Sequence, residues 1–283
     1  MDLCNSNEIK TLLARHGFRF SKSMGQNFLI ESWVPRDIAE ASGASPQTGV
    51  LEIGPGIGPL TVQLAQRAGR VVCLELDEAL LPILAETLSS YGNTEVLSGD
   101  ILKADLAALV TEKLAGLTPI VCANLPYNIT TPVLTALIES GLFASITVMI
   151  QREVARRCAA APGTPDYGAF SVFCQYYTTP QVLFDVPPDC FLPAPKVTSS
   201  VIRFVPRPEP AQSLADDAAF FRVVRASFAQ RRKTLLNSLY AVFGSRMSKD
   251  ELKSLIESVG LPSDVRGERL EISDFAKIAQ KLP

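Results

Sequence analysis

Short apolar runs alternate with amphipathic stretches between residues 50 and 151. The runs have the length of buried strands, and the stretches between them place apolar residues at helical spacing. The predicted strands are 50–54, 71–76, 94–100, 119–125 and 146–151. Buried strands that alternate with helices form βαβ units with right-handed crossovers. The pattern therefore predicts an α/β fold around a parallel sheet.

The pattern changes after residue 165. Three segments, 167–179, 180–187 and 199–206, resemble strands separated only by turns, so they are expected to add antiparallel strands at one edge of the sheet. Helical spacing is expected over 7–17, 33–42, 216–230, 231–243, 248–258 and 273–281.

Three parts follow from this order of elements. Residues 1–30 form an N-terminal helix and an arm, 31–206 form the α/β domain, and 207–283 form a small helical domain. The Pro-rich, polar stretch 206–213 is the predicted linker between the last two.

Composition describes an ordinary globular chain, with 283 residues, 47% hydrophobic and 20% charged. The sequence contains no run of 18 apolar residues, so no membrane span is expected, and its N-terminus lacks the layout of a signal peptide. Six dispersed cysteines without a C-x-x-C pair indicate reduced thiols of a cytoplasmic protein. The single histidine, His16, argues against a histidine-based metal site, and no metal is expected.

Charge is unevenly distributed, although the net charge is only −2. Residues 206–283 contain 13 Lys and Arg against 10 Asp and Glu, whereas 1–205 contain 14 against 19. The tail includes the run Arg231, Arg232 and Lys233. From charge alone, a solvated helix face is the simpler interpretation of this run.

A glycine loop follows the first predicted strand in "VLEIGPGIGPLT". Gly54, Gly56 and Gly58 form G-x-G-x-G, and Pro59 stands where a dinucleotide fingerprint has its last glycine. The loop therefore fits a nicotinamide cofactor poorly, although its backbone can still approach a ligand closely. Turn chemistry alone would also explain the glycines. Glu52 is placed to brace the loop.

Two acids follow at the ends of the next two predicted strands. Glu75 can accept hydrogen bonds from both hydroxyls of a ribose, and Asp100 can accept one from an adenine amino group. With the glycine loop they outline an adenosine site across three strand ends. This set resembles the class I S-adenosylmethionine-dependent methyltransferases, which implies a Rossmann-like, seven-stranded and mostly parallel sheet. Residues 199–206 are the candidate for its antiparallel strand.

The fourth predicted strand ends in Asn124, Leu125, Pro126 and Tyr127. This resembles the N-P-P-Y motif of methyltransferases that act on exocyclic amino groups of bases. The adenine N6 lone pair is delocalised, so acceptors for both N6 hydrogens would favour attack. The Asn124 side chain and the Leu125 carbonyl can be those acceptors, while Pro126 stiffens the turn and Tyr127 stacks on the base. A capped turn is the alternative interpretation.

Three further stretches narrow the resemblance: "SMGQNFL" (23–29), "FLPAPKVTSSVIRF" (191–204) and "FAQRRKTLLNSL" (228–239). With the two earlier motifs they resemble the ribosomal RNA adenine N6,N6-dimethyltransferase family over residues 8–280. The last two are similar to the bacterial small-subunit branch, whose loss gives kasugamycin resistance.

The resemblance implies that the arm covers S-adenosyl-L-methionine, with Gln26 bracing it. Implied cofactor contacts are Asn27, Leu29, Gly54, Gly56, Glu75, Asp100 and Asn124. It implies a second stacking aromatic, Phe191, for which a core contact stays an alternative.

The implied substrate is a pair of adjacent adenosines in the 3′-terminal hairpin loop of 16S ribosomal RNA, in an immature 30S subunit. The helical domain would then bind RNA, and the protein would act as a cytoplasmic monomer away from membranes. Candidate RNA contacts are Arg15, Arg19, Lys22, Arg152, Arg156, Arg157, Arg231, Arg232 and Lys233.

Two other functions stay open at this point. The chain could act chiefly as a ribosome-assembly factor whose binding role outweighs methylation. It could also be a macrolide-resistance type 23S ribosomal RNA adenine dimethyltransferase, which the tail motif disfavours.

Overall fold

A computed structural model describes residues 1–20, 25–212, 216–230 and 232–282. The chain divides into two compact units. The first contains Met1–Ala155 and Gln181–Pro206, and the second contains Arg156–Pro180 and Arg207–Pro283. The second unit thus includes residues 156–180 as well as the tail.

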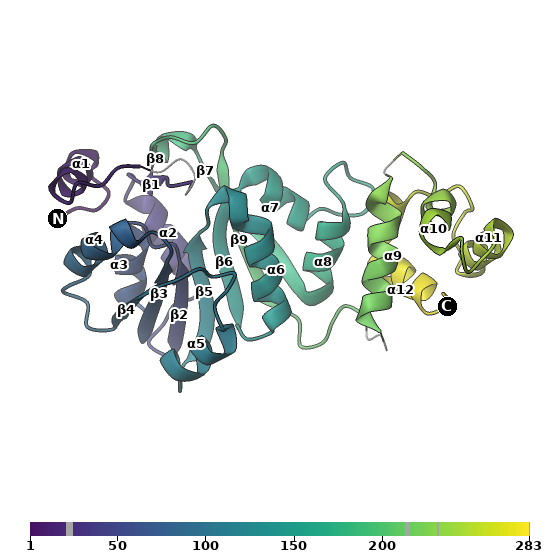
Figure 1. The fold of residues 1–283 in the computed structure, drawn as a ribbon, viewed down its shortest axis with the longest axis horizontal. Helices are drawn as coiled ribbons and strands as arrows, with labels where there is room; N and C mark the ends of the chain where they lie inside the picture. The colour runs from purple at the N-terminus through teal and green to yellow at the C-terminus, as the bar shows by residue number, and fades with distance from the viewer. Residues whose placement is uncertain (21–24, 213–215, 231, 283) are drawn as a thin grey trace. The chain divides into compact units, whose positions relative to one another are not determined.

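A seven-stranded sheet forms the centre of the first unit, in the order β4-β3-β2-β5-β6-β9-β7 (Figure 1). Its strands are β2 (Thr48–Ile53), β3 (Arg70–Glu75), β4 (Thr94–Ser98), β5 (Thr118–Asn124), β6 (Ser145–Gln151), β7 (Thr178–Val186) and β9 (Ser199–Pro206). Strands β4, β3, β2, β5 and β6 pair in parallel, and β9 pairs antiparallel with β6. The predicted fold class and the antiparallel strand are confirmed.

Four helices connect the parallel strands: α3 (Pro59–Ala65), α4 (Leu81–Thr87), α5 (Leu106–Lys113) and α6 (Thr130–Ser140). Helix α2 (Trp33–Ala41) precedes β2, and short 3-10 turns lie at η2 (Glu78–Leu80) and η3 (Tyr127–Ile129). Buried apolar side chains of α2 and α3 pack with those of β2, β3 and β5 in one cluster. Helix α7 (Arg152–Cys158) leads from the first unit into the second. Because the parallel strands all point the same way, their carboxyl ends meet at one edge.

A separate two-stranded sheet attaches the N-terminal arm to the rest of the first unit. Helix α1 (Ser6–Arg15) precedes β1 (Phe28–Leu29), which pairs antiparallel with β8 (Phe191–Leu192) after the turn η4 (Pro188–Cys190). The Ile30 amide donates to the Cys190 carbonyl at 2.9 Å. The rings of Phe20 and Phe28 lie 5.2 Å apart. Residues distant in sequence therefore meet over the sheet edge.

The second unit is helical, with α8 (Ala169–Tyr177), α9 (Asp217–Ala229), α10 (Leu235–Phe243), α11 (Lys249–Ser258), η5 (Gly267–Arg269) and α12 (Ile272–Ala279). The strand predicted over 167–179 is wrong, since this segment contains α8. Its aromatic and β-branched residues favour strands locally, but tertiary packing overrides that preference. The ring of Tyr176 stacks on that of Phe220 at 4.7 Å, and the rings of Phe173 and Phe221 lie 5.9 Å apart, so α8 packs against α9.

Candidate active site

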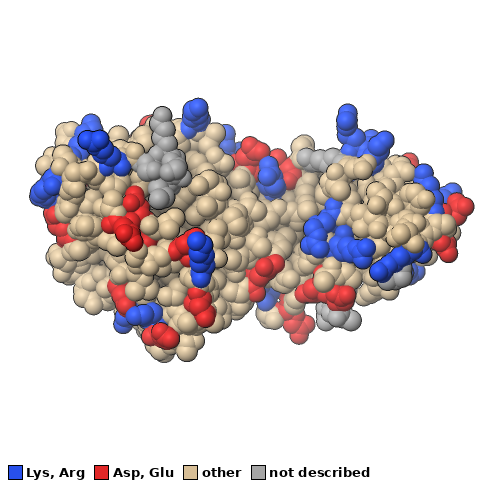
Figure 2. Space-filling view, viewed as in Figure 1, with Lys and Arg blue, Asp and Glu red and all other residues tan. Residues whose placement is uncertain are grey.

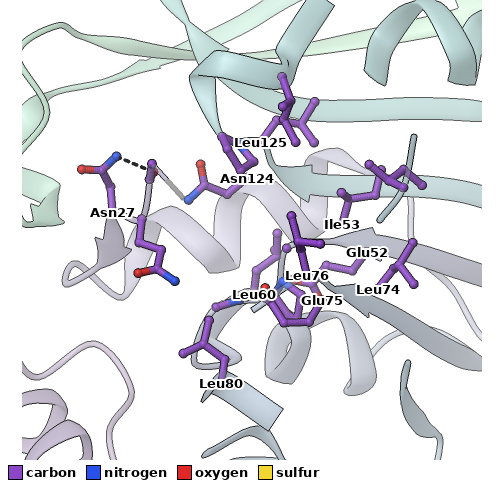
Figure 3. A pocket seen from close by; sticks show the side chains of 18 of the residues that line it. Asn27, Glu52, Ile53, Leu60, Leu74, Glu75, Leu76, Leu80, Asn124 and Leu125 are labelled. Atoms are coloured by element: carbon purple, nitrogen blue, oxygen red, sulfur yellow. Dashed lines mark hydrogen bonds between the residues drawn. The ribbon is translucent and has the colours of Figure 1, made fainter. Parts of the chain in front are cut away.

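A cavity lies at the carboxyl ends of β2, β3 and β5, beside the residues that follow β4 and beneath the arm (Figure 3). It holds about 1130 Å³ of space, part of which is open to solvent. The structure brings together at this cavity all the predicted cofactor contacts and the four-residue motif: Asn27, Leu29, Gly54, Gly56, Glu75, Asp100, Asn124, Leu125, Pro126 and Tyr127.

The glycine loop needs its glycines for two physical reasons. Gly54, Gly56 and Gly58 have φ values of +65°, +63° and +94°, where side chains with a Cβ are strained. A Cβ on Gly56 would also lie 3.3 Å from the ring of Phe28 in the arm. The loop is therefore shaped by its own backbone and covered directly by β1.

Glu75 connects the loop to the end of β3. The residue is only 6% exposed. One carboxylate oxygen accepts from the Asp77 amide at 2.8 Å and the other from the Gly56 amide at 3.4 Å. Burial raises the pKa of the Glu75 carboxyl above its ordinary value. The carboxylate thus lies at the cavity with its orientation determined by two backbone donors.

Glu52 lies deeper, at the end of β2, and is 1% exposed. The Cys73 thiol donates to its carboxyl at 3.5 Å, and Thr61 also hydrogen-bonds to it. Burial raises the pKa of Glu52 to about 8. At neutral pH this residue is therefore mostly a neutral acid that braces the sheet beneath the loop.

Replacing Glu52 with glutamine should reduce the decrease in the free energy of unfolding that the wild type shows as the pH rises from 5 to 8. A carboxyl whose folded pKa is raised from 4.5 to about 8 stabilises the fold below pH 4.5, and that stability is lost as the pH rises through 8. Between pH 5 and 8 the loss is on the order of 3–4 kcal/mol. Urea unfolding of Glu52→Gln and of the wild type at pH 5, 6, 7 and 8 measures it. The same change at exposed Glu78 is the control, and parallel profiles for Glu52→Gln and the wild type would contradict the argument.

Asp100 follows β4 at the rim of the cavity. Its carboxylate accepts from the Leu102 amide at 3.0 Å and lies 3.9 Å from the Lys103 ammonium. Its side chain is 28% exposed, so the carboxylate keeps an accessible acceptor at the cavity.

The end of β5 presents two acceptors. Within the described part of the chain, no hydrogen bond involves the Asn124 side chain or the Leu125 carbonyl. The neighbouring Pro126 carbonyl, by contrast, accepts from Thr130 at 3.1 Å and from Ile129 at 3.3 Å. The Leu125 amide donates to Met149 at 3.1 Å, which secures the turn to β6. The turn therefore leaves these two acceptors uncommitted.

Tyr127 begins the turn η3 and is half-buried at the cavity. Its phenol is 2.7 Å from the hydroxyl of Ser199, the first residue of β9. Burial raises the pKa of the phenol. Sequence reasoning missed Ser199, although it lies within the quoted stretch 191–204, because only the sheet topology places β9 beside this turn.

The arm also lines the cavity. The Gln26 amide donates to the Asp77 carboxylate at 2.6 Å, and the Asn27 amide donates to the Gly25 carbonyl at 3.1 Å. Asp77, which the motifs did not indicate, thus joins Glu75 in connecting β3 to neighbouring segments.

Phe191 is not at the cavity within the described residues. In β8, Phe191 pairs with Leu29 of β1. It is 3% exposed and belongs to the buried cluster that includes Val34. Phe191 therefore makes the core contact that the sequence left open as the alternative to stacking on a base. A stacking role for Phe191 stays a prediction.

The candidate RNA contacts lie in both units. In the first, Arg15 pairs with Glu86, Arg19 is exposed, and Arg152 lies 3.6 Å from Asp185. The second unit contains four further candidates, all of them exposed: Arg156, Arg157, Arg232 and Lys233. Lys22 and Arg231 lie outside the described residues. Figure 2 shows Lys and Arg side chains on the surface of each unit, with acidic side chains among them.

Within the described residues, no group of three or more His, Cys, Asp or Glu side chains is arranged to hold a metal ion. In the same residues, no helix has the length and apolar character needed to cross a membrane. The six cysteines are free thiols, and all but Cys4 are buried.

Comparison with known proteins adds independent information. The family model described as ribosomal RNA adenine dimethylase matches residues 17–282. A protein named ribosomal RNA small subunit methyltransferase A, from Geobacillus thermodenitrificans, is 47% identical over 99% of this chain and 97% of its own length. The protein of that name from Streptococcus pneumoniae is 46% identical over 100% and 98%.

Solved structures are similar in fold. The 23S rRNA methyltransferase ErmE has a TM-score of 0.68 and 26% identity, and the match covers 90% of this chain and 99% of that one. A dimethyladenosine transferase from Plasmodium falciparum has a TM-score of 0.73 and 24% identity, with 88% and 95% covered. From the family match and the full-length relatives, the chain belongs to the ribosomal RNA adenine dimethylase family.

Proposed function

We propose that this chain transfers methyl groups from S-adenosylmethionine to N6 of two adjacent adenosines in the 3′-terminal hairpin loop of 16S ribosomal RNA. The observation that supports this most is the pair of uncommitted acceptors, Asn124 and the Leu125 carbonyl, at the same cavity as Glu75 and Asp100. One cavity therefore offers groups for the adenosine part of a cofactor and for the amino group of a target base.

The residues present fit the cofactor. The positive-φ glycines bring bare backbone to the cavity, Glu75 offers carboxylate acceptors for ribose hydroxyls, and Asp100 offers one for the adenine amino group. Leu76, 51% exposed and lining the cavity, offers an apolar surface for the adenine ring. When bound, S-adenosylmethionine supplies a methyl group on a positively charged sulfur.

The chain's own contribution to the reaction is positioning. Asn124 and Leu125 would accept the two N6 hydrogens and orient the nitrogen, while the ring of Tyr127 would hold the base by stacking. As the new N–C bond forms and the S–C bond breaks, the sulfur would leave as a neutral thioether and N6 would become cationic. The cationic nitrogen is acidic enough to lose its proton to water. The mechanism therefore assigns no general base to the chain.

The test is methyl transfer to small subunits that lack the modification. Purified protein with labelled S-adenosylmethionine should label their RNA, and mass spectrometry should locate dimethyladenosine at two adjacent positions of the 3′-terminal hairpin. Labelling of naked 23S RNA instead would favour the large-subunit alternative. An absence of transfer despite intact cofactor binding would defeat the proposal.

Replacing Glu75 with alanine should weaken S-adenosylmethionine binding about 10- to 100-fold, because hydrogen bonds to a charged acceptor contribute about 1.5–3 kcal/mol each. Titration calorimetry measures the effect. Glu78→Ala, which removes an exposed carboxylate three residues later, is the matched control and should bind as the wild type does. An unchanged dissociation constant for Glu75→Ala would rule out the assigned contact.

The proposed partner is the immature 30S subunit, bound by a monomer in the cytoplasm. Support comes from charge, since the second unit contains 15 Lys and Arg against 11 Asp and Glu, and the first 12 against 18. RNA phosphates favour the more basic unit. Exposed Arg156, Arg157, Arg232 and Lys233 are the proposed contacts there, and Arg15, Arg19 and Arg152 those of the first unit.

A further inference from the structure

The hydrogen bond between Tyr127 and Ser199 connects two segments that are 72 residues apart. Ser199 is fully buried, and its register partner on β6 is Gln151. Tyr127, by contrast, lies in a short turn at the cavity after β5. One end of the bond is therefore held inside the central sheet, and the other is on a side chain at the reaction site.

An aromatic ring on a turn has two rotatable side-chain torsions, and stacking on a base requires one orientation. The turn around Tyr127 is held by backbone and Thr130 bonds to the Pro126 carbonyl, which restrain the main chain but not the ring. Within the described residues, the bond at 2.7 Å to Ser199 is the hydrogen bond that the Tyr127 side chain makes. It restrains the tip of the ring against a rigid strand.

We propose that Ser199 is a positioning residue for methyl transfer, which sets the angle of the Tyr127 ring against the target adenine by holding its phenol. This inference rests on the proposed function, because it takes Tyr127 as the surface that holds the base. It also means that the phenol is occupied as a hydrogen-bonding group, so Tyr127 contributes its ring face rather than its hydroxyl.

The neighbouring residue offers a matched control. Ser200 is equally buried on β9, but its hydroxyl donates to the Asp185 carboxylate at 2.5 Å. Successive strand residues point to opposite faces of a sheet, so the two serines differ in partner while sharing burial and strand. Ser199→Ala and Ser200→Ala therefore remove similar buried hydroxyls from different networks.

The test is single-turnover and steady-state methyl transfer to unmodified small subunits by Ser199→Ala, Tyr127→Phe and the double variant. Each single change should lower kcat about 3- to 10-fold, the range expected for one net hydrogen bond. The double variant should be no slower than the slower single variant, because both changes remove the same bond. KM for subunits should change less than 2-fold, roughly, because phosphate contacts elsewhere dominate RNA affinity.

Three controls separate positioning from a loss of folding. S-adenosylmethionine affinity by calorimetry should be unchanged in every variant, Ser200→Ala should keep wild-type kcat, and Ser199→Thr should retain most activity because it keeps a hydroxyl. Additive losses in the double variant, or an equal loss in Ser200→Ala, would overturn the inference. If the wild type itself transfers no methyl groups to small subunits, the proposed function fails instead, which is a different outcome.

Discussion

Replacing Asn124 with alanine should reduce methyl transfer to small subunits by about 100- to 1000-fold, as expected for removing one preorganised hydrogen-bonding group from a reaction site. Asn124 ends β5 at the cavity, and its amide has no other hydrogen-bond partner among the described residues. Without it, only the Leu125 carbonyl would orient the N6 amino group. Single-turnover transfer at saturating cofactor measures the loss.

Cofactor affinity provides the internal control for this variant. Asn124 is also an expected cofactor contact, so a change in affinity of about 10-fold or less is anticipated from a single neutral hydrogen bond. Asn7→Ala, at an exposed position in α1, controls for the substitution itself and should transfer at the wild-type rate. A loss of transfer that is fully explained by weaker cofactor binding would contradict the proposed acceptor role.

The same variant distinguishes catalysis from an assembly role. If Asn124→Ala binds immature small subunits and supports normal assembly, the binding role of the protein dominates. If assembly fails in step with methylation, the assembly-factor alternative is disfavoured. Subunit profiles in a strain that contains only the variant supply the measurement.

Replacing Tyr127 with alanine should lower methyl transfer about 10- to 100-fold while leaving S-adenosylmethionine affinity nearly unchanged. Stacking of a base on an aromatic side chain contributes about 1–3 kcal/mol, and the alanine variant loses that surface entirely. Transfer to small subunits and calorimetry with the cofactor measure the two effects separately.

Tyr127→Phe is the informative comparison, because it keeps the ring and removes only the phenol that contacts Ser199. It should lose clearly less activity than the alanine variant. Tyr91→Ala is the control, because Tyr91 packs beside α3 and α4 and does not line the cavity. It should lower the stability of the protein without lowering methyl transfer relative to cofactor affinity. Equal losses of transfer and cofactor affinity in Tyr127→Ala would contradict the stacking role.

Four parallel strands of the central sheet, β2, β3, β5 and β6, were predictable because each contains a buried apolar run, whereas β4 at the edge is only half-buried. Burial on both faces makes such runs recognisable without knowledge of their neighbours. The same reasoning failed for 167–179, where aromatic and β-branched residues serve helix α8 inside an aromatic cluster. Local preference is a weak guide wherever packing on several sides decides the conformation.

By itself, the sequence determined the alternation of strands and helices between residues 50 and 151, the glycine loop, and the acids and amide at the ends of successive strands. Parallel strands carry their carboxyl ends to one edge, so chain order was enough to bring Gly54, Glu75, Asp100 and Asn124 to one cavity. Only the tertiary structure decided which distant side chains support them. The contacts of Ser199 with Tyr127, Asp77 with Gln26 and Phe28 with Gly56 depend on the antiparallel insertion of β9 and on the path of the arm. Such contacts join segments that are far apart in the chain, and the number of residues between two segments does not predict how close they lie in the folded protein.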